Sequence, residues 1–223
     1  MSNSDYKREA LKVLKGNWTP SVLATIIVTL VLLPYVALAE LPGVLHVGTK
    51  LMGSLSLGAF LYMVFVGYPV EVSYDNAIRH HIMTGDSGVI AKVWHIFCDH
   101  WLHLCWGYLL LGIKIFLWTL LLVIPGIIKA FSYAMTPFIL VEFPELSASQ
   151  AIQLSRKIMS GRKFDLFYLY LSFIGWFFLC ILTLGIGFLW LVPYTTGAVA
   201  AFYNDAKEQY FLEHPVVEDP VRY

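Results

Sequence analysis

Two histidines and a carboxylate recur at a spacing that suits metal binding. His95, Asp99 and His103 are each four residues apart, so on a helix their side chains share one face. Imidazole and carboxylate groups are ligands that zinc and similar ions accept. The same residue types are also ordinary where a helix leaves a membrane, and the spacing alone is unspecific. We therefore expect no bound metal and no other cofactor, and keep the three residues only as candidates.

A single lysine lies inside a long apolar segment. Lys114 is near the middle of the stretch from Trp101 to Val123, eleven residues after His103. A charge at that depth costs several kcal/mol unless it is paired or hydrated, so charged residues inside membranes are candidates for function. The sequence predicts no carboxylate at the same depth, so a proton or ion relay would lack one of its parts. Snorkelling to the membrane surface and a neutral amine are the alternatives.

The composition identifies the bilayer as the solvent of this chain. The 223 residues are 58% hydrophobic and only 13% charged, and the mean hydropathy is +0.69. A soluble domain carries roughly 25% charged residues. With half of that charge, a soluble fold would expose apolar patches of a size that soluble monomers rarely show. The chain is therefore predicted to be an all-α, multi-spanning membrane protein.

Motifs of known enzyme classes are absent from the sequence. It contains neither a HExxH or GxSxG motif nor a phosphate-binding glycine pattern. The net charge is zero, so no overall field favours nucleic acid as a partner. The cysteines are three, an odd number without a disulfide-type spacing. We expect a protein that is not an enzyme.

Apolar segments of spanning length divide the chain into six predicted transmembrane helices, arranged as three hairpins. About 20 apolar residues are needed to cross a bilayer. The predicted spans are Thr19 to Ala39, Leu51 to Val70, Trp101 to Val123, Ile127 to Val141, Phe164 to Leu184 and Gly187 to Phe202. Turns are predicted at Pro125 and Gly126 and again from Gly185 to Gly187, because glycine and proline adopt turn dihedrals at low cost. A further turn is predicted from Gly85 to Gly88.

The first apolar segment has a second interpretation. A basic start, an apolar core and Ala37-Leu38-Ala39 before Glu40 also resemble a cleavable signal peptide. Cleavage would remove residues 1–39 and leave five spans. The basic region is long for a signal and the apolar segment has full spanning length, so a retained helix is the preferred interpretation.

Two amphipathic segments are predicted to lie at the membrane surface. In residues 4–16, Ser4 can cap a helix whose lysines face lipid phosphates; a solvated charged helix is the alternative. The second, residues 147–160, follows Pro144, which ends the fourth span. Ser147 and Gln150 form a capping box, apolar residues recur at helical spacing, and Gly161 ends the helix.

The distribution of lysine and arginine predicts the orientation. Twelve of these residues fall in the N-terminal segment, the polar section of residues 71–100, the section of residues 142–163 and the tail, whereas Lys50 and Lys129 fall on the opposite side. Positive charge is enriched in cytoplasmic loops, so both termini are predicted to be cytoplasmic. The predicted regions are a cytoplasmic helix (1–18), a six-helix membrane domain (19–203) and a poorly ordered cytoplasmic tail (204–223).

The second half of the chain resembles a known family. The motifs that carry the resemblance are Ile124 to Tyr133, Pro144 to Ala148 with Ala151, Ser155, Met159 and Gly161, Leu171 to Trp176, Leu182 to Gly187, and Pro193-Tyr194 to Tyr203. Together they are similar to a bacterial integral-membrane family known as domain of unknown function nine-seven-five, over a core of residues 116–203. The resemblance implies a multi-pass protein of the bacterial inner membrane and no catalytic residues. Its structural motif positions here are Pro125, Gly126, Lys129, Pro144, Ser147, Gly185, Gly187 and Pro193.

Two functions remain open from the sequence. The first is a non-enzymatic inner-membrane protein that binds membrane lipids, a membrane-protein partner or a second copy of itself, in an assembly, envelope-stress or immunity-type role. It rests on the basic amphipathic segments and the missing catalytic set. The second is a small transporter or channel that uses Lys114.

Overall fold

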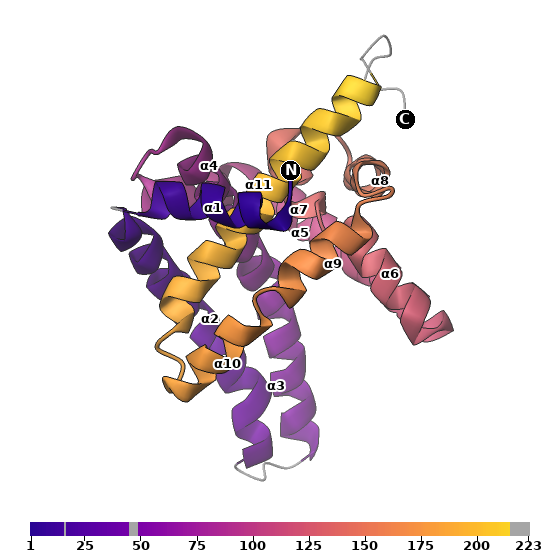
Figure 1. The fold of residues 1–223 in the computed structure, drawn as a ribbon. Coiled ribbons are helices and arrows are strands. Elements are labelled where there is room, and N and C mark those ends of the chain that lie inside the picture. The colour runs from indigo at the N-terminus through magenta and orange to yellow at the C-terminus, as the bar shows by residue number, and fades with distance from the viewer. Residues whose placement is uncertain (16, 45–48, 215–223) are drawn as a thin grey trace.

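The computed structural model describes residues 1–15, 17–44 and 49–214, and all regular secondary structure in these ranges is helical (Figure 1). The long apolar helices confirm an all-α fold with several segments that could cross a membrane. The elements are α1 (Asn3–Leu14), α2 (Trp18–Val44), α3 (Thr49–Tyr62), the π-helical turn η1 (Met63–Gly67), α4 (Tyr68–Thr84), α5 (Val89–Leu121), α6 (Val123–Tyr133), α7 (Thr136–Glu142), α8 (Ala148–Ile158), α9 (Lys163–Leu171), α10 (Ile174–Leu182) and α11 (Phe188–Glu213).

Five helical segments of the described chain are long and apolar enough to span a bilayer. They are Trp18–Glu40, Leu51–Thr84, Val89–Leu121, Val123–Glu142 and Lys163–Leu182. In the most apolar window of the first segment only 17% of the residues are buried inside the protein. Large apolar side chains such as Leu120, Ile124 and Leu182 are likewise exposed. Lipid is the medium that would cover this surface.

The second apolar segment continues much further than the sequence suggests. The predicted span ends at Val70, but α3, η1 and α4 form one uninterrupted helical segment to Thr84, which ends at Gly85 in the left-handed conformation (φ 72°). Polar residues after Glu71 therefore lie on a helix and not in a loop. The predicted turn at residues 85–88 is present, and α5 begins directly after it.

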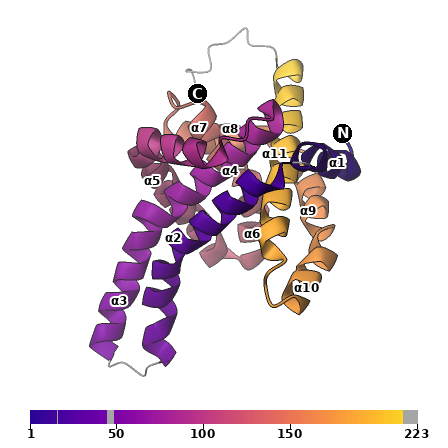
Figure 2. The same ribbon diagram turned by 90° about the vertical axis from the view of Figure 1, so that its left-hand side faces the viewer.

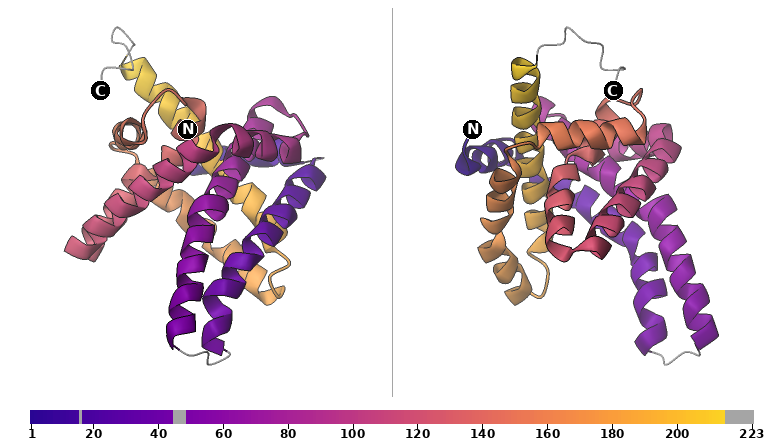
Figure 3. Two further views of the ribbon diagram at one scale, coloured as in Figure 1. Left: turned by 180° about the vertical axis from the view of Figure 1, so that it is seen from behind. Right: turned by 90° about the vertical axis from the view of Figure 1, so that its right-hand side faces the viewer.

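The turn between α5 and α6 lies at Leu122, not at Pro125 and Gly126 as predicted. Leu122 is extended (φ −162°, ψ 140°), whereas Pro125 sits in the first turn of α6, where its missing N–H removes no helical hydrogen bond. Gly126 serves packing, because a Cβ there would lie 2.5 Å from the Thr119 hydroxyl and 2.9 Å from Thr119 Cα. The paired helices project as an arm that diverges from the α2–α3 arm (Figure 3).

The chain leaves the membrane segment at Pro144 and enters α8 through the predicted capping box. Gln150 Oε1 accepts the Ser147 N–H at 2.8 Å, and the Ser147 hydroxyl accepts the Gln150 N–H at 3.4 Å. Gly161, with φ 80°, ends this section in the left-handed conformation that glycine adopts readily.

The last two apolar helices are joined by the predicted glycine turn. Gly185 has φ 88°, and a Cβ on Gly187 would lie 2.8 Å from the Cys180 sulfur. Helix α11 contains Pro193 without ending there and continues to Glu213. Residues 204–213 are thus helical, not the poorly ordered tail that the sequence predicts; the rest of that tail lies outside the described residues.

The N-terminal helix packs on other helices of the protein. Tyr6, Ala10 and Leu14 are buried against neighbouring helices, chiefly α11, where Gly197 allows Ala10 to approach (Figure 2). The helix is capped by Ser2 with Asp5, and not by the predicted Ser4. Its apolar stripe is therefore unavailable to a bilayer, although Lys12 and Lys15 stay exposed. The beginning of α1 and the end of α11 lie on the same side of the molecule (Figure 1).

Candidate functional site

A pocket with a cavity volume of about 310 Å³ brings Lys114 next to helix α8. Its lining comes from three elements: Lys114 of α5, Tyr133 of α6, and Ile152, Gln153 and Arg156 of α8. The sequence placed Lys114 in the middle of a span. In the structure Lys114 shares a pocket with the helix that the sequence places at the membrane surface, which fits the snorkelling alternative better than a buried charge.

Two of the lining residues, Tyr133 and Ile152, also belong to a small apolar cluster. In this cluster Leu111, Tyr133 and Ile152 are each less than a tenth exposed and pack together apart from the main core, with Leu110 and Ile115 against them. Gln153 and Arg156 on the next face of α8 are exposed. The pocket therefore has a mostly polar, cationic lining that adjoins a buried apolar cluster, a combination that suits a small amphiphilic ligand.

A hydrogen-bonded helix break fixes the three elements around the pocket. Helices α6 and α7 are separated at Ala134 and Met135, and the freed backbone groups there bind one side chain of α8. The Ser155 hydroxyl donates to the Ser132 carbonyl at 3.1 Å and accepts the Met135 N–H at 3.2 Å. Since Ser155 precedes Arg156, this contact holds the pocket face of α8 beside Tyr133.

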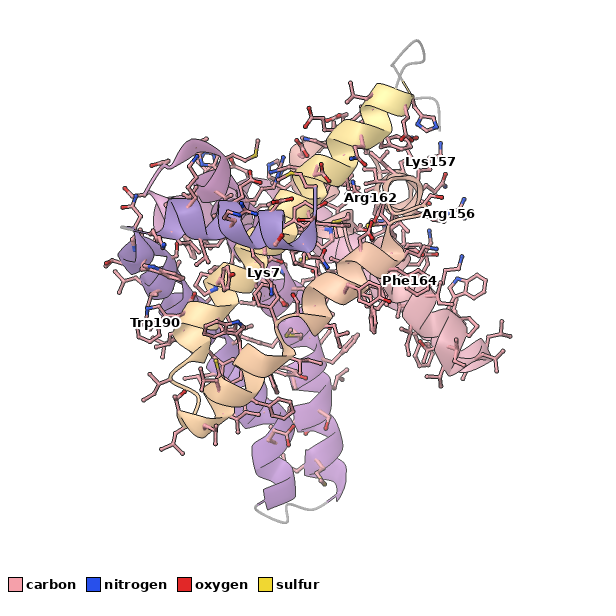
Figure 4. The ribbon with its side chains drawn as sticks, viewed as in Figure 1. Lys7, Arg156, Lys157, Arg162, Phe164 and Trp190 are labelled. Atoms are coloured by element: carbon pink, nitrogen blue, oxygen red, sulfur yellow. The ribbon has the colours of Figure 1, made fainter. Side chains whose placement is uncertain are left out.

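The two cations of the pocket have no anionic partner among the described residues. The ion pairs found there involve Arg8, Arg79, His95, Arg162, Lys207 and the N-terminal amine, and neither Lys114 nor Arg156 takes part. Figure 4 shows Arg156 and the neighbouring Lys157 on the outer side of α8. An anion in the pocket would supply the missing counter-charge.

The predicted metal candidates do not assemble into a site. His95 Nδ1 lies 2.8 Å from Asp99 Oδ2, and both side chains are largely exposed. His103 takes no part in this pair, and its Nε2 is buried without a hydrogen-bond partner. No group of three or more potential metal ligands occurs in the described part of the chain.

Two carboxylates from the section of residues 71–100, which the sequence analysis placed after the second span, lie on α4, inside the second apolar segment. Glu71 and Asp75 are one helical turn apart. Asp75 Oδ1 accepts a hydrogen bond from the Thr196 hydroxyl of α11 at 3.5 Å. Within the described ranges neither carboxylate forms an ion pair. Their four-residue spacing in a stretch without glycine or proline after Pro69 was the available signal.

Two ion-paired clusters, around Glu142 and Asp205, join helices that are far apart in the sequence. Glu142 of α7 accepts from Arg79 of α4 at 2.8 Å and from Tyr203 and Lys207 of α11, each at 2.5 Å. Asp205 accepts from Arg162 and from the Tyr6 hydroxyl, each at 2.6 Å. The sequence analysis did not predict these pairs, because partners far apart in the chain meet only in the folded bundle.

The remaining motif positions have structural roles. The Lys129 amine lies 4.4 Å from the centroid of the Trp118 ring, a cation–π contact across the α5–α6 pair. Pro125 lies in the first turn of α6, Pro144 in the turn before α8, and Pro193 inside α11. Ser147 caps α8, and Gly126, Gly185 and Gly187 allow turns or close helix contacts.

The fold identifies the class of protein: a helical protein with several helices that could cross a membrane. Residues 105–209 match the model of a family described as a protein of unknown function (DUF975). The match confirms the resemblance found in the sequence and includes every residue that lines the Lys114 pocket. No curated protein and no solved structure matches the chain.

Proposed function

We propose that this protein is a multi-pass protein of the bacterial inner membrane, with both termini in the cytoplasm, that acts by binding membrane lipid and not by catalysis. The observation that carries the proposal is the Lys114 pocket. Unpaired cations in its lining and the exposed apolar side chains of the adjoining helices match the two chemical parts of a phospholipid. A membrane-protein partner or a second copy is the other class of occupant.

Lipid retained during purification tests the proposal. We expect the full chain, extracted in mild detergent, to carry phospholipid that native mass spectrometry detects, and to unfold at a lower temperature after lipid is removed. Recovery of a lipid-free protein of unchanged stability, together with a co-purified protein partner, would favour partner binding instead.

A transport function is the second candidate, and the Glu71–Asp75 pair supports it. Two neighbouring carboxylates inside an apolar segment are costly, and intramembrane carboxylates are typical of ion and proton pathways. In liposomes containing a pH-sensitive dye, we expect Asp75→Asn to abolish any proton flux that the protein catalyses. Asp99→Asn is the matched control, because Asp99 is exposed on α5. Absence of flux in the unmodified protein would remove this candidate function. Loss of the flux in Lys114→Leu would show that transport depends on Lys114.

A further inference from the structure

We infer that the pocket between α5, α6 and α8 binds a phosphate group, and that Lys114 and Arg156 provide the charge that holds it. This inference rests on the proposed function, because a phospholipid headgroup is one source of such a group. A free phosphate ester or inorganic phosphate is the other source, and both present the same anionic oxygens.

The charge balance of the pocket favours an anion. Lys114 and Arg156 come from different helices and line one cavity, while no carboxylate is among the lining residues. Like charges that face the same space repel each other, and a bound anion would remove that repulsion. Arginine can bind two phosphate oxygens at once through its planar guanidinium, and lysine adds a compact charge.

The neutral lining residues add hydrogen-bond donors. Tyr133 is only 6% exposed and lines the pocket, and its hydroxyl forms no hydrogen bond with any described residue. The Gln153 amide also has no partner in the described part of the chain. Together the four polar side chains offer many more donors than acceptors, as a group with several acceptor oxygens requires.

The size of the pocket restricts what enters it. A volume of about 310 Å³ lies at the lower end of the range for small-molecule sites. It suits a headgroup or a small phosphate ester better than a whole lipid. The acyl chains of a lipid would lie outside, along exposed apolar side chains such as Phe116 and Ile127 of the α5–α6 arm.

Thermal unfolding of the full chain in mixed micelles tests the inference. The probes are phosphatidylglycerol, phosphatidylcholine and inorganic phosphate, with the variants Lys114→Gln and Arg156→Gln. The control is Lys12→Gln, which removes the same charge from an exposed position on α1. We expect either pocket variant to lower the apparent affinity for the anionic probe that stabilises the unmodified protein, phosphatidylglycerol or inorganic phosphate, about tenfold or more, as expected when a charge-assisted hydrogen bond is lost. Zwitterionic phosphatidylcholine is the lipid control. The control should bind like the unmodified protein.

The outcomes separate the two sources and the two proposals. A selective shift with phosphatidylglycerol identifies a headgroup site, and a shift with inorganic phosphate identifies a soluble phosphate ligand; both support the inference. Equal binding by the pocket variants and the control overturns it, while lipid retained without regard to headgroup would leave the proposed function standing. If a glutamine variant fails to fold, Tyr133→Phe and Lys114→Arg test the same site with smaller changes.

Discussion

Ser155 shows how a single hydroxyl can position a site. It is fully buried, donates to the Ser132 carbonyl and accepts from the Met135 N–H, so it supplies both hydrogen bonds that the α6–α7 break leaves open. Ser155→Ala would leave two buried backbone groups without partners. Each unsatisfied group costs about 1–3 kcal/mol. For the two groups together we expect a loss of unfolding free energy of about 2–6 kcal/mol and weaker phosphate binding, measured by thermal unfolding with and without ligand. Ser160→Ala, on the exposed end of the same section, should change neither.

The Asp205 carboxylate makes the stability of the folded protein depend on pH in the acid range. Burial, the largest single cause, raises the pKa of this carboxyl, but the hydrogen bonds from Arg162 and Tyr6 and the Arg162 charge together outweigh it. The folded-state pKa therefore lies below the ordinary value of 3.8. The pair stabilises the fold fully above the unfolded-state pKa, and this contribution is lost as the pH falls below about 4 toward the folded-state pKa.

Removal of the Asp205 charge should reproduce this loss at neutral pH. The side chains of Arg162 and Asp205 are 15% and 13% exposed, so Asp205→Asn leaves a poorly solvated guanidinium. We expect a loss of about 1–3 kcal/mol at pH 7 and a weaker dependence of the melting temperature on acid. Asp165→Asn is the control, because this carboxylate is 56% exposed and lies 3.9 Å from the same arginine. Equal effects of the two variants would contradict a specific role for Asp205.

At the scale of elements, the α5–α6 pair depends on the absence of one side chain. A Cβ at position 126 would meet both the hydroxyl and the backbone of Thr119, and backbone cannot move aside cheaply. We expect Gly126→Ala to destabilise the protein by about 1–3 kcal/mol, the usual cost of overpacking. Gly112→Ala, on the partner helix α5 and without a neighbour within 4 Å, is the matched control. The melting temperatures of the two variants are measured in the same detergent. Similar values would contradict the prediction, because they would show that α5 and α6 can move apart to accept a Cβ at position 126.

The sequence predicted elements best where one residue type has one local role. The capping box of Ser147 and Gln150, the end at Gly161 and the turn at Gly185 each follow from local backbone chemistry, and all are present. The Leu122 turn was misplaced because proline and glycine near a helix start look like a turn in the sequence.

Tertiary contacts explain what the sequence could not predict. The end of α11 is polar, yet it is held by Asp205 and Lys207, whose partners lie on α1, α7 and the segment before α9. The N-terminal helix is amphipathic, and periodicity alone cannot distinguish an apolar stripe that faces lipid from one that faces α11. The sequence predicted only one residue of the pocket for the same reason. Lys114 is unusual in the sequence itself, whereas Arg156 and Tyr133 lie near it only after three helices pack together.

At the scale of the whole molecule, the contact between the two ends of the chain constrains how often it crosses the membrane. Five segments are apolar enough to span, and five crossings would place α1 and the end of α11 on opposite sides. Yet Tyr6 of α1 donates to Asp205 of α11 at 2.6 Å, and Ala10 approaches Gly197. An even number of crossings satisfies both observations. The simplest solution is that α11 crosses as well, although its polar C-terminal half lowers its hydropathy.

Side-specific cysteine labelling tests this topology in intact cells. In a background where Cys98, Cys105 and Cys180 are replaced, single cysteines would be placed at Asn3 and Glu213, near the ends of the described helices, and at Leu184 in the turn before α11. Because the α1–α11 contact holds both ends together, we expect a membrane-impermeant maleimide to label only Leu184→Cys until the cells are opened. Labelling of Leu184→Cys and Glu213→Cys under the same condition would show that α11 does not cross. One of the five apolar segments would then have to enter and leave the membrane on the same side, since the Tyr6–Asp205 contact still requires an even count.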